Sequence, residues 1–280
     1  MSGTAYNEPI GIAGCGAMGL PMAQSLLAAG YDVWGFDVRP VEEFGNFAGR
    51  MIADPPAFAA RCPTVISVVR DIRQTLDLCF EAQALFAGAA RPRRLVVSST
   101  VSPRFLHELT ARLPAGTELI DAPMSGAPVA AREARLTFMV GGGEAAVGEL
   151  MPLFQAMGKA VHHLGGLGAG MTVKVVNNFV AASSVVAVRH AMAAAQALGV
   201  APDLLTKVMA QSSGATWYGD NLAAIDWAAE GYDPDNTIGI LEKDVTSFMD
   251  ALADLPEFEG GEQAETVIRN LRKLPPADCA

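Results

Sequence analysis

Short apolar runs alternate with amphipathic stretches over the first 165 residues. The runs that we predict to be strands lie at residues 9–14, 31–37, 64–69, 95–99, 118–121, 136–140 and 160–164. Apolar positions recur with helical spacing in the segments 17–29, 71–86 and 144–157, and Ser102-Pro103 supplies an N-cap with proline at the first position of another helix. This α/β alternation predicts a mostly parallel, doubly wound sheet of the Rossmann type.

The pattern changes at a glycine-rich segment, residues 165–170. Beyond it residues 170–198 are rich in Ala, Val and Met, and they predict a helix of roughly 43 Å, which is too long for one small domain to cover. Further helices fit the segments 202–211, 216–229, 237–254 and 262–273. We therefore predict a dinucleotide-binding Rossmann domain in residues 1–166 and an all-α substrate and oligomerisation domain in residues 167–280, with a long interdomain helix.

Composition narrows the classes of partner. A formal net charge of −10 argues against nucleic acid and anionic membranes, while a small anionic substrate stays possible. The four cysteines show neither metal-ligand spacing nor the density of a disulfide scaffold, and we expect no metal. The N-terminal segment lacks the pattern of a signal peptide, and Arg189 and His190 interrupt the most apolar stretch. A reduced, cytoplasmic protein is the expectation.

A glycine motif opens the first predicted helix. Gly14 permits a tight turn, Gly16 lets the backbone approach a pyrophosphate, and Gly19 lets helix and strand pack closely. The amides of Ala17 and Met18 complete the expected phosphate cradle at the helix N-terminus.

Two residues at the end of the next predicted strand bear on the choice of cofactor. Asp37 follows Gly19 by 18 residues, where a carboxylate accepts hydrogen bonds from the adenosine ribose and repels a 2′-phosphate. NAD is therefore favoured. NADP stays possible because the guanidinium of Arg39 could pair with that phosphate.

An ammonium and two amides lie together on the long predicted helix. Lys174 and Asn178 are spaced i, i+4 on one face, and Asn177 is adjacent. A lysine in apolar surroundings often extends its amine to water, but two amides in an apolar helix need polar partners. A buried lysine can serve as general acid or base, and this pattern favours catalysis of proton transfer.

Taken in order, the motifs resemble those of the β-hydroxyacid dehydrogenase family, whose best-known member is 3-hydroxyisobutyrate dehydrogenase. The motifs that carry the resemblance are residues 14–23 (GCGAMGLPMA), 121–126 (DAPMSG), 136–142 (LTFMVGG), 165–178 (GGLGAGMTVKVVNN) and the late pair Lys243-Asp244. The resemblance covers roughly residues 9–255. It implies a Rossmann domain followed by a helical domain like that of 6-phosphogluconate dehydrogenase.

The resemblance also implies roles for individual residues. Lys174 matches the lysine that exchanges the proton of the substrate alcohol, and Asn178 matches the amide that orients the substrate. Ser125 and Gly126, followed by the Ala127 amide, match the loop that grips the substrate carboxylate. Lys243 matches a lysine near the carboxylate and the nicotinamide. The residues that match segments along the cofactor are Val68, Val69 and Thr100.

The resulting hypothesis is an NAD-dependent dehydrogenase of short 3-hydroxy acids. Ala127-Pro128 and Asn236 depart from the family pattern, which suggests a more polar acid than 3-hydroxyisobutyrate. One alternative is an NAD(P)H-dependent reductase of a small semialdehyde such as tartronate or succinic semialdehyde. Another is a non-enzymatic cofactor-binding protein, which should show a damaged lysine motif.

Two related enzyme classes fit the sequence less well. The 6-phosphogluconate dehydrogenases place histidine where Asn177 stands, and imine reductases usually lack the lysine, so both are less favoured.

The long helix bears on the oligomeric state. Small apolar residues on more than one of its faces predict a homodimer or homotetramer.

Overall fold

The computed structural model describes residues 6–255 and 261–277. Its residues form two compact units, Met1–Lys174 and Val175–Ala280, and the division falls inside the long helix α7 (Ala169–Ala197). Each unit has its own hydrophobic core. The first unit contains every strand that the described residues form, and the second is helical. This is the predicted fold class, a Rossmann-type α/β domain followed by an all-α domain.

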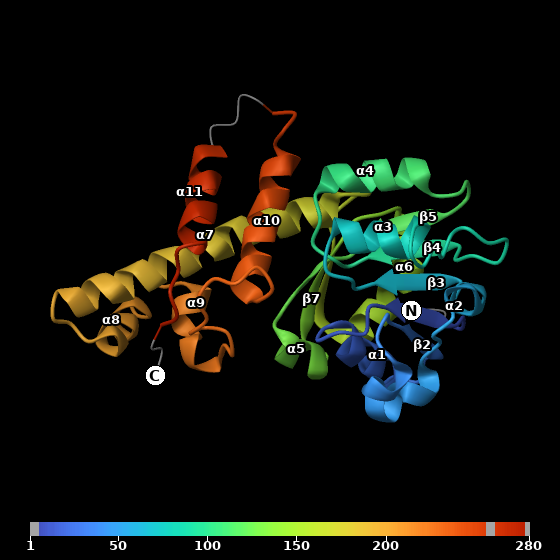
Figure 1. The fold of residues 1–280 in the computed structure, drawn as a ribbon, viewed down its shortest axis with the longest axis horizontal. Helices are drawn as coiled ribbons and strands as arrows, with labels where there is room; N and C mark the ends of the chain where they lie inside the picture. Colours follow the sequence, from blue (N-terminus) through green and yellow to red (C-terminus); the bar gives the residue numbers. More distant parts are fainter. Residues whose placement is uncertain (1–5, 256–260, 278–280) are drawn as a thin grey trace. The chain divides into compact units, whose positions relative to one another are not determined.

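A parallel sheet of five strands forms the centre of the first unit (Figure 1). In spatial order its strands are β2 (Val33–Phe36), β1 (Ile10–Ala13), β3 (Thr64–Ser67), β4 (Arg94–Val97) and β5 (Glu118–Asp121). The chain reverses direction across the sheet next to β1, as it does in doubly wound folds. All five carboxyl ends therefore lie along one edge, where ligands bind in such folds.

The strands predicted beyond β5 belong to a second, smaller sheet. It contains β6 (Met124–Ser125), β7 (Leu136–Val140) and β8 (Gly158–His163), with β6 antiparallel to β7 and β8 parallel to β7. A bridge between Asp121 and Gly141 joins the two sheets. The short strand β6 was not predicted, because two residues carry no readable alternation.

Helices cover both faces of the five-stranded sheet. One core contains α1 (Gly19–Ala28) and α6 (Glu144–Met157), together with strand residues such as Ile12 and Ile66. The opposite core contains α2 (Pro55–Arg61), α3 (Ile72–Phe80) and α4 (Pro103–Arg112). Successive strand residues point to opposite cores, as the period of two requires.

Helix termini in this unit follow local chemistry. Ser102 caps α4 by accepting a hydrogen bond from the Arg104 amide, with Pro103 at the first helical position, as predicted. Asp54 caps α2 and Asp71 caps α3 in the same way. The predicted helix 71–86 ends early, at Phe80, and the segment Val41–Arg50 forms 3₁₀ turns with a kink at Gly45. A short helix, α5 (Pro128–Arg132), was not predicted.

The helical unit packs around the second half of α7. Its other helices are α8 (Pro202–Met209), α9 (Trp217–Asp220), α10 (Thr237–Ala251) and α11 (Gly261–Leu271). The predicted helix 216–229 is wrong in extent, because α9 ends at Asp220 and only a 3₁₀ turn, Leu222–Ala224, follows. By length and composition α7 could cross a membrane, a property that it shares with the core helices of folded domains.

Candidate active site

The glycine loop after β1 has the geometry of a phosphate cradle. Gly14 has a φ of +90°, and a Cβ there would lie 2.9 Å from the Val68 carbonyl oxygen. A Cβ on Gly19 would lie only 1.9 Å from the Gly14 oxygen, so both positions require glycine. A Cβ on Gly16 would meet no heavy atom within 4 Å, which leaves its backbone open to a ligand. These positions fit the pyrophosphate of a dinucleotide.

The N-terminus of α1 is suited to an anion. Met18 occupies the cap position, yet it makes no side-chain cap, and the first turn holds no acidic residue. The partial positive charge of the helix end is thus not offset by a carboxylate within that turn.

Two other predicted cofactor segments meet this loop. The Val68 amide donates to the Ala13 carbonyl over 2.7 Å, which places Val68 against the end of β1. The Ser99 hydroxyl donates to the Val69 carbonyl over 2.5 Å, which ties the segment before Thr100 to the same place. The structure therefore brings together the chain segments after β1, β3 and β4 at the carboxyl edge of the sheet.

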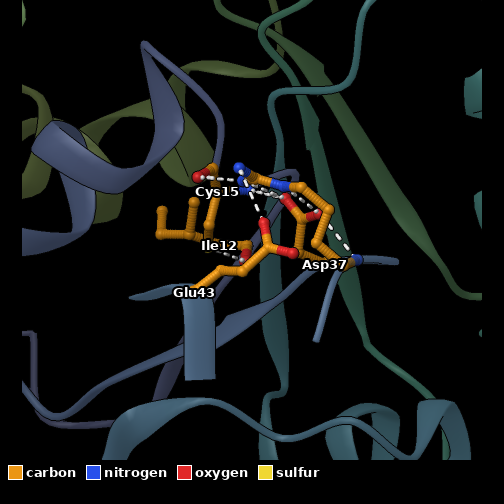
Figure 2. Close-up of polar contacts among 5 residues, drawn as sticks. Ile12, Cys15, Asp37 and Glu43 are labelled. Carbon is orange, nitrogen blue, oxygen red and sulfur yellow. Dashed lines mark hydrogen bonds and ion pairs between the residues drawn. The ribbon is translucent and has the colours of Figure 1, made fainter. Parts of the chain in front are cut away.

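The two residues that bear on cofactor choice are in contact with each other. Asp37 accepts a hydrogen bond from the Cys15 amide over 2.8 Å (Figure 2). It accepts another from Nε of Arg39 over 3.0 Å. Arg39 also donates from Nη2 to the Cys15 carbonyl over 2.9 Å, and its guanidinium lies 4.7 Å from the centre of the Phe44 ring. Asp37 thus organises the glycine loop while Arg39 is held beside it.

Charge and burial set the protonation of this cluster. Burial raises the pKa of Asp37, but hydrogen bonds from Arg39 outweigh burial and leave the pKa below its ordinary value. Burial raises the pKa of the Cys15 thiol to about 12, so Cys15 stays a neutral thiol and packs in the core. The lowered pKa keeps Asp37 ionised at neutral pH, so its oxygens act as hydrogen-bond acceptors.

The predicted carboxylate loop joins β6 to α5. Ser125 ends β6 opposite Thr137, and Gly126 has a φ of +134°. A Cβ on Gly126 would lie 2.9 Å from Cβ of Ala130, so glycine is needed for both its angle and its packing. Ala127 is extended, as the following proline predicts, and it precedes the first turn of α5. A bend at Gly126 and the extended Ala127 thus form a short loop, whose backbone is restricted by the glycine angle and the following proline.

A buried carboxylate holds the start of α7. Asp121 is the last residue of β5, and its two oxygens accept hydrogen bonds from the amides of Gly168 and Met171, each over 2.7 Å. Lys174 follows Met171 by three residues and is itself buried, with 8% of its surface exposed. The helix that carries the predicted catalytic lysine therefore begins at the same sheet edge as the glycine loop.

A cluster of polar side chains around Asp244 lies within the helical unit. Asn178 donates from Nδ2 to Oδ2 of Asp244 over 2.5 Å, and Nζ of Lys243 lies 2.7 Å from Oδ1 of the same carboxylate. Asn177 donates to Oδ1 of Asn178 over 3.1 Å. The two predicted substrate residues, Asn178 and Lys243, are thus joined through Asp244, which is 2% exposed.

Asn236 has a structural role that the sequence did not suggest. Its side-chain oxygen accepts from the amides of Ile238 and Gly239, which caps α10, and its Nδ2 donates to the Gly231 carbonyl. Both ends of the amide are already bonded, so the residue does not support the inference of a more polar substrate.

Sequence reasoning missed the part played by two aspartates. In the sequence Asp121 and Asp244 stand out only as members of motifs. In the structure Asp121 accepts hydrogen bonds from two amides at the start of the helix that carries Lys174, and Asp244 contacts Asn178 and Lys243. A signal existed for Asp121, because an aspartate that ends a buried strand needs donors. Asp244 resembled a surface charge next to a lysine and offered no such signal.

Family models match nearly the whole chain. Residues 9–165 match the NAD-binding domain of 6-phosphogluconate dehydrogenase. Residues 168–275 match the NAD-binding domain of NADP-dependent 3-hydroxyisobutyrate dehydrogenase. With the glycine loop, the two-domain fold and the buried lysine on α7, these matches define the class: the chain belongs to the β-hydroxyacid dehydrogenase family. It is an NAD(P)-dependent oxidoreductase of that family.

Similar proteins share most of the chain's length. The L-threonate dehydrogenase of Cupriavidus necator is 35% identical over 86% of this chain and 82% of its own. The NAD-dependent L-serine dehydrogenase of Pseudomonas aeruginosa is 32% identical over 94% of this chain and 83% of its own. Among solved structures, the 3-hydroxyisobutyrate dehydrogenase of Mycobacterium tuberculosis with L-serine superposes with a TM-score of 0.77, at 28% identity over 98% and 97% of the two chains.

Proposed function

We propose that this protein oxidises the alcohol of a short 3-hydroxy acid with NAD, and that Lys174 is the general base that receives the alcohol proton. In the reverse direction the same amine donates the proton to the carbonyl oxygen. One observation carries the proposal: Lys174 is buried on a helix whose first turn is fixed at the carboxyl edge of the five-stranded sheet. The glycine loop follows β1 at that same edge.

Different residues around the glycine loop would bind different parts of the cofactor. The open backbone at Gly16 and the uncapped start of α1 would hold the pyrophosphate, while Asp37 would accept hydrogen bonds from the ribose hydroxyls. The nicotinamide, when bound, supplies the hydride acceptor. The protein supplies the proton relay, because loss of the hydride makes the hydroxyl proton acidic and a buried amine can take it.

The proposed substrate is a small anion. The Ser125 hydroxyl and the amides of the Gly126–Ala127 loop would provide hydrogen-bond donors for a carboxylate. Within the helical unit, Lys243 carries a positive charge that is paired with Asp244. Asn178 is the amide that would orient the hydroxyl-bearing carbon. The compounds named for the similar enzymes, L-threonate, L-serine and 3-hydroxyisobutyrate, all combine a carboxylate with an alcohol.

A substrate panel tests this proposal. The purified protein is incubated with NAD and each of 3-hydroxyisobutyrate, L-serine, L-threonate and glycerate, and NADH formation gives kcat/KM. The carboxamide of each acid serves as its uncharged control. We expect at least one acid to be oxidised and its carboxamide to be poorer by about 10- to 100-fold, the range of a hydrogen bond to a charged group.

Three outcomes would contradict parts of the proposal. Absence of turnover on every hydroxy acid would remove the assigned reaction. Equal kcat/KM on acid and carboxamide would remove the carboxylate-binding role of Ser125 and Lys243. Reduction of tartronate or succinic semialdehyde by NADH, without oxidation of any acid in the panel, would identify the semialdehyde reductase alternative.

A further inference from the structure

Asp121 makes an unusually complete set of contacts for a strand-terminal residue. Its carboxylate is fully buried, and each oxygen accepts one backbone amide from the segment that begins α7. Its own backbone exchanges hydrogen bonds with Gly141 at the end of β7, over 3.0 Å and 2.8 Å. One residue therefore links the five-stranded sheet, the three-stranded sheet and the first turn of α7.

The surroundings leave the carboxylate no room to move. A Cβ on Gly141 would lie 2.4 Å from Oδ1 of Asp121. A Cβ on Gly170 would lie 2.8 Å from Oδ2 and 2.3 Å from the Met139 carbonyl oxygen. Glycines on both sides thus let the backbone approach the two carboxylate oxygens more closely than any other residue would allow.

Burying the Asp121 carboxylate costs more free energy than capping a helix with an exposed aspartate. Burial raises the pKa of Asp121 above its ordinary value, although hydrogen bonds from Gly168 and Met171 oppose the rise. Asp54 and Asp71, by contrast, cap α2 and α3 through one amide each, in hydrogen bonds that are exposed to solvent. A helix of 29 residues does not need a buried charge in order to form. The feature is better explained by a need for exact placement.

Lys174 is the residue that benefits from that placement. It lies three residues after Met171 on the same helix, so fixing the Gly168 and Met171 amides fixes the position of its Cα. Catalytic groups must be held within about 0.5 Å of their working geometry, and an error of about 1 Å can cost roughly 100-fold in rate.

We propose that Asp121 is a positioning residue, which seats the first turn of α7 on the sheet and thereby places the Lys174 amine for proton transfer. The proposal rests on the proposed function of Lys174 as general base. Asp121 acts through the backbone amides of the helix start, and removal of one acceptor oxygen should disturb the lysine without disturbing the glycine loop.

The central test is Asp121→Asn. This variant keeps the shape of the side chain but replaces one acceptor oxygen with an NH₂ group, which cannot accept a hydrogen bond from a backbone amide. Asp54→Asn is the matched control, a capping aspartate in the same unit. We expect Asp121→Asn to lower kcat by about 10- to 100-fold while the Kd for NADH stays within about twofold, and Asp54→Asn to leave kcat unchanged. In a Lys174→Ala background Asp121→Asn should cost less than about threefold more, because both act through one amine.

Several results would overturn the proposal. Unchanged kcat in Asp121→Asn would do so, and so would a full additional loss in the Lys174→Ala background. If Asp121→Asn does not fold, Gly170→Ala tests the same junction with Asp121 in place, since its Cβ would push the helix start off the sheet. Native kcat in that variant would also refute the positioning role.

Hydrogen exchange separates this inference from the proposed function. In the full-length protein, Asp121→Asn should speed exchange of the Gly168–Lys174 amides, and Asp54→Asn should not. Unchanged exchange there would refute the seating of the helix. If Lys174→Ala retains full turnover while the exchange result holds, the assignment of Lys174 fails and the seating of α7 by Asp121 stands alone.

Discussion

Arg39 is bound to Asp37 two residues before it. Nε of Arg39 lies 3.0 Å from Oδ1 and Nη2 lies 3.2 Å from Oδ2, and the Arg39 amide also donates to Oδ1 over 3.1 Å. The two charges that are expected to discriminate between NAD and NADP are therefore paired with each other. The carboxylate keeps its ionised form. The guanidinium contacts both Asp37 oxygens, the Cys15 carbonyl, the Glu43 carboxylate and the Phe44 ring.

We expect NAD to be preferred over NADP in kcat/KM, because a bound 2′-phosphate would face the Asp37 carboxylate. Asp37→Asn should lower kcat/KM for NAD by about 10- to 100-fold and narrow the preference. Asp77→Asn, which removes a similar arginine pair on α3, is the control and should change neither cofactor. A measured preference for NADP would mean that Arg39 leaves Asp37 to bind the phosphate.

The depressed pKa of Asp37 makes a pH-dependent contribution to stability. Because the folded-state pKa lies below the ordinary value of 3.8, the ionised form stabilises the fold above that pH, and the contribution is lost as the pH falls through the folded-state pKa. The Tm of the wild type should exceed that of Asp37→Asn at neutral pH, and the gap should narrow below about pH 4. A gap that stays constant from neutral to acid pH would contradict the pairing.

Loss of the Lys174 amine should abolish most turnover while cofactor binding persists. Removal of a general acid or base costs about 10²- to 10⁴-fold, so Lys174→Ala should lower kcat within that range and leave the Kd for NADH unchanged. Lys207→Ala is the matched control, since Lys207 is an exposed lysine paired with Asp203 on α8. A near-native kcat in Lys174→Ala would exclude the proton-transfer role.

Asp244 should stabilise the helical unit through its two partners. Asp244→Ala leaves the buried Asn178 amide without its carboxylate acceptor and removes the ion pair of Lys243, with an expected loss of about 2 kcal/mol in the free energy of unfolding. Urea denaturation measures the loss. Thr246→Ala, at an exposed position of the same helix, should change the unfolding free energy by less than about 0.5 kcal/mol. If Asp244→Ala and Thr246→Ala lower the free energy of unfolding equally, the contacts of Asp244 with Asn178 and Lys243 do not stabilise the unit.

We predict a homodimer or homotetramer from exposed apolar residues on two helices of the helical unit. Val176 and Val180 on α7 are 47% and 61% exposed, and Leu204 and Val208 on α8 are 55% and 57% exposed. Each pair is spaced i, i+4, so each forms an apolar stripe suited to a second copy of the chain. Sedimentation at micromolar protein should show a multiple of 29.2 kDa. A single species at that mass would refute the prediction.

Local interactions explain why much of the fold could be predicted. The strands at 118–121 and 136–140 and the helix at 144–157 are observed with the predicted limits, because periodicity and short-range packing define them. Ser102-Pro103 begins its helix as predicted, since the capping hydroxyl and the Arg104 amide that donates to it lie two residues apart. The glycine loop is only partly local. The Gly14 φ of +90° and the clash of a Gly19 Cβ with the Gly14 oxygen arise within the turn, whereas a Gly14 Cβ would meet Val68 of a distant segment.

Long-range packing decided the rest. Asp121 finds its donors 47 and 50 residues further along the chain, and Asn178 finds Asp244 after 66 residues. Asn236, by contrast, bonds to its own helix start and the adjacent loop, although its departure from the family pattern suggested a more polar substrate. The sequence by itself determined the class of fold, the glycine cradle and the lysine on its helix. Only the tertiary structure decided which donors each buried carboxylate meets, because a buried polar group is satisfied by whichever groups the packed backbone brings within hydrogen-bond distance.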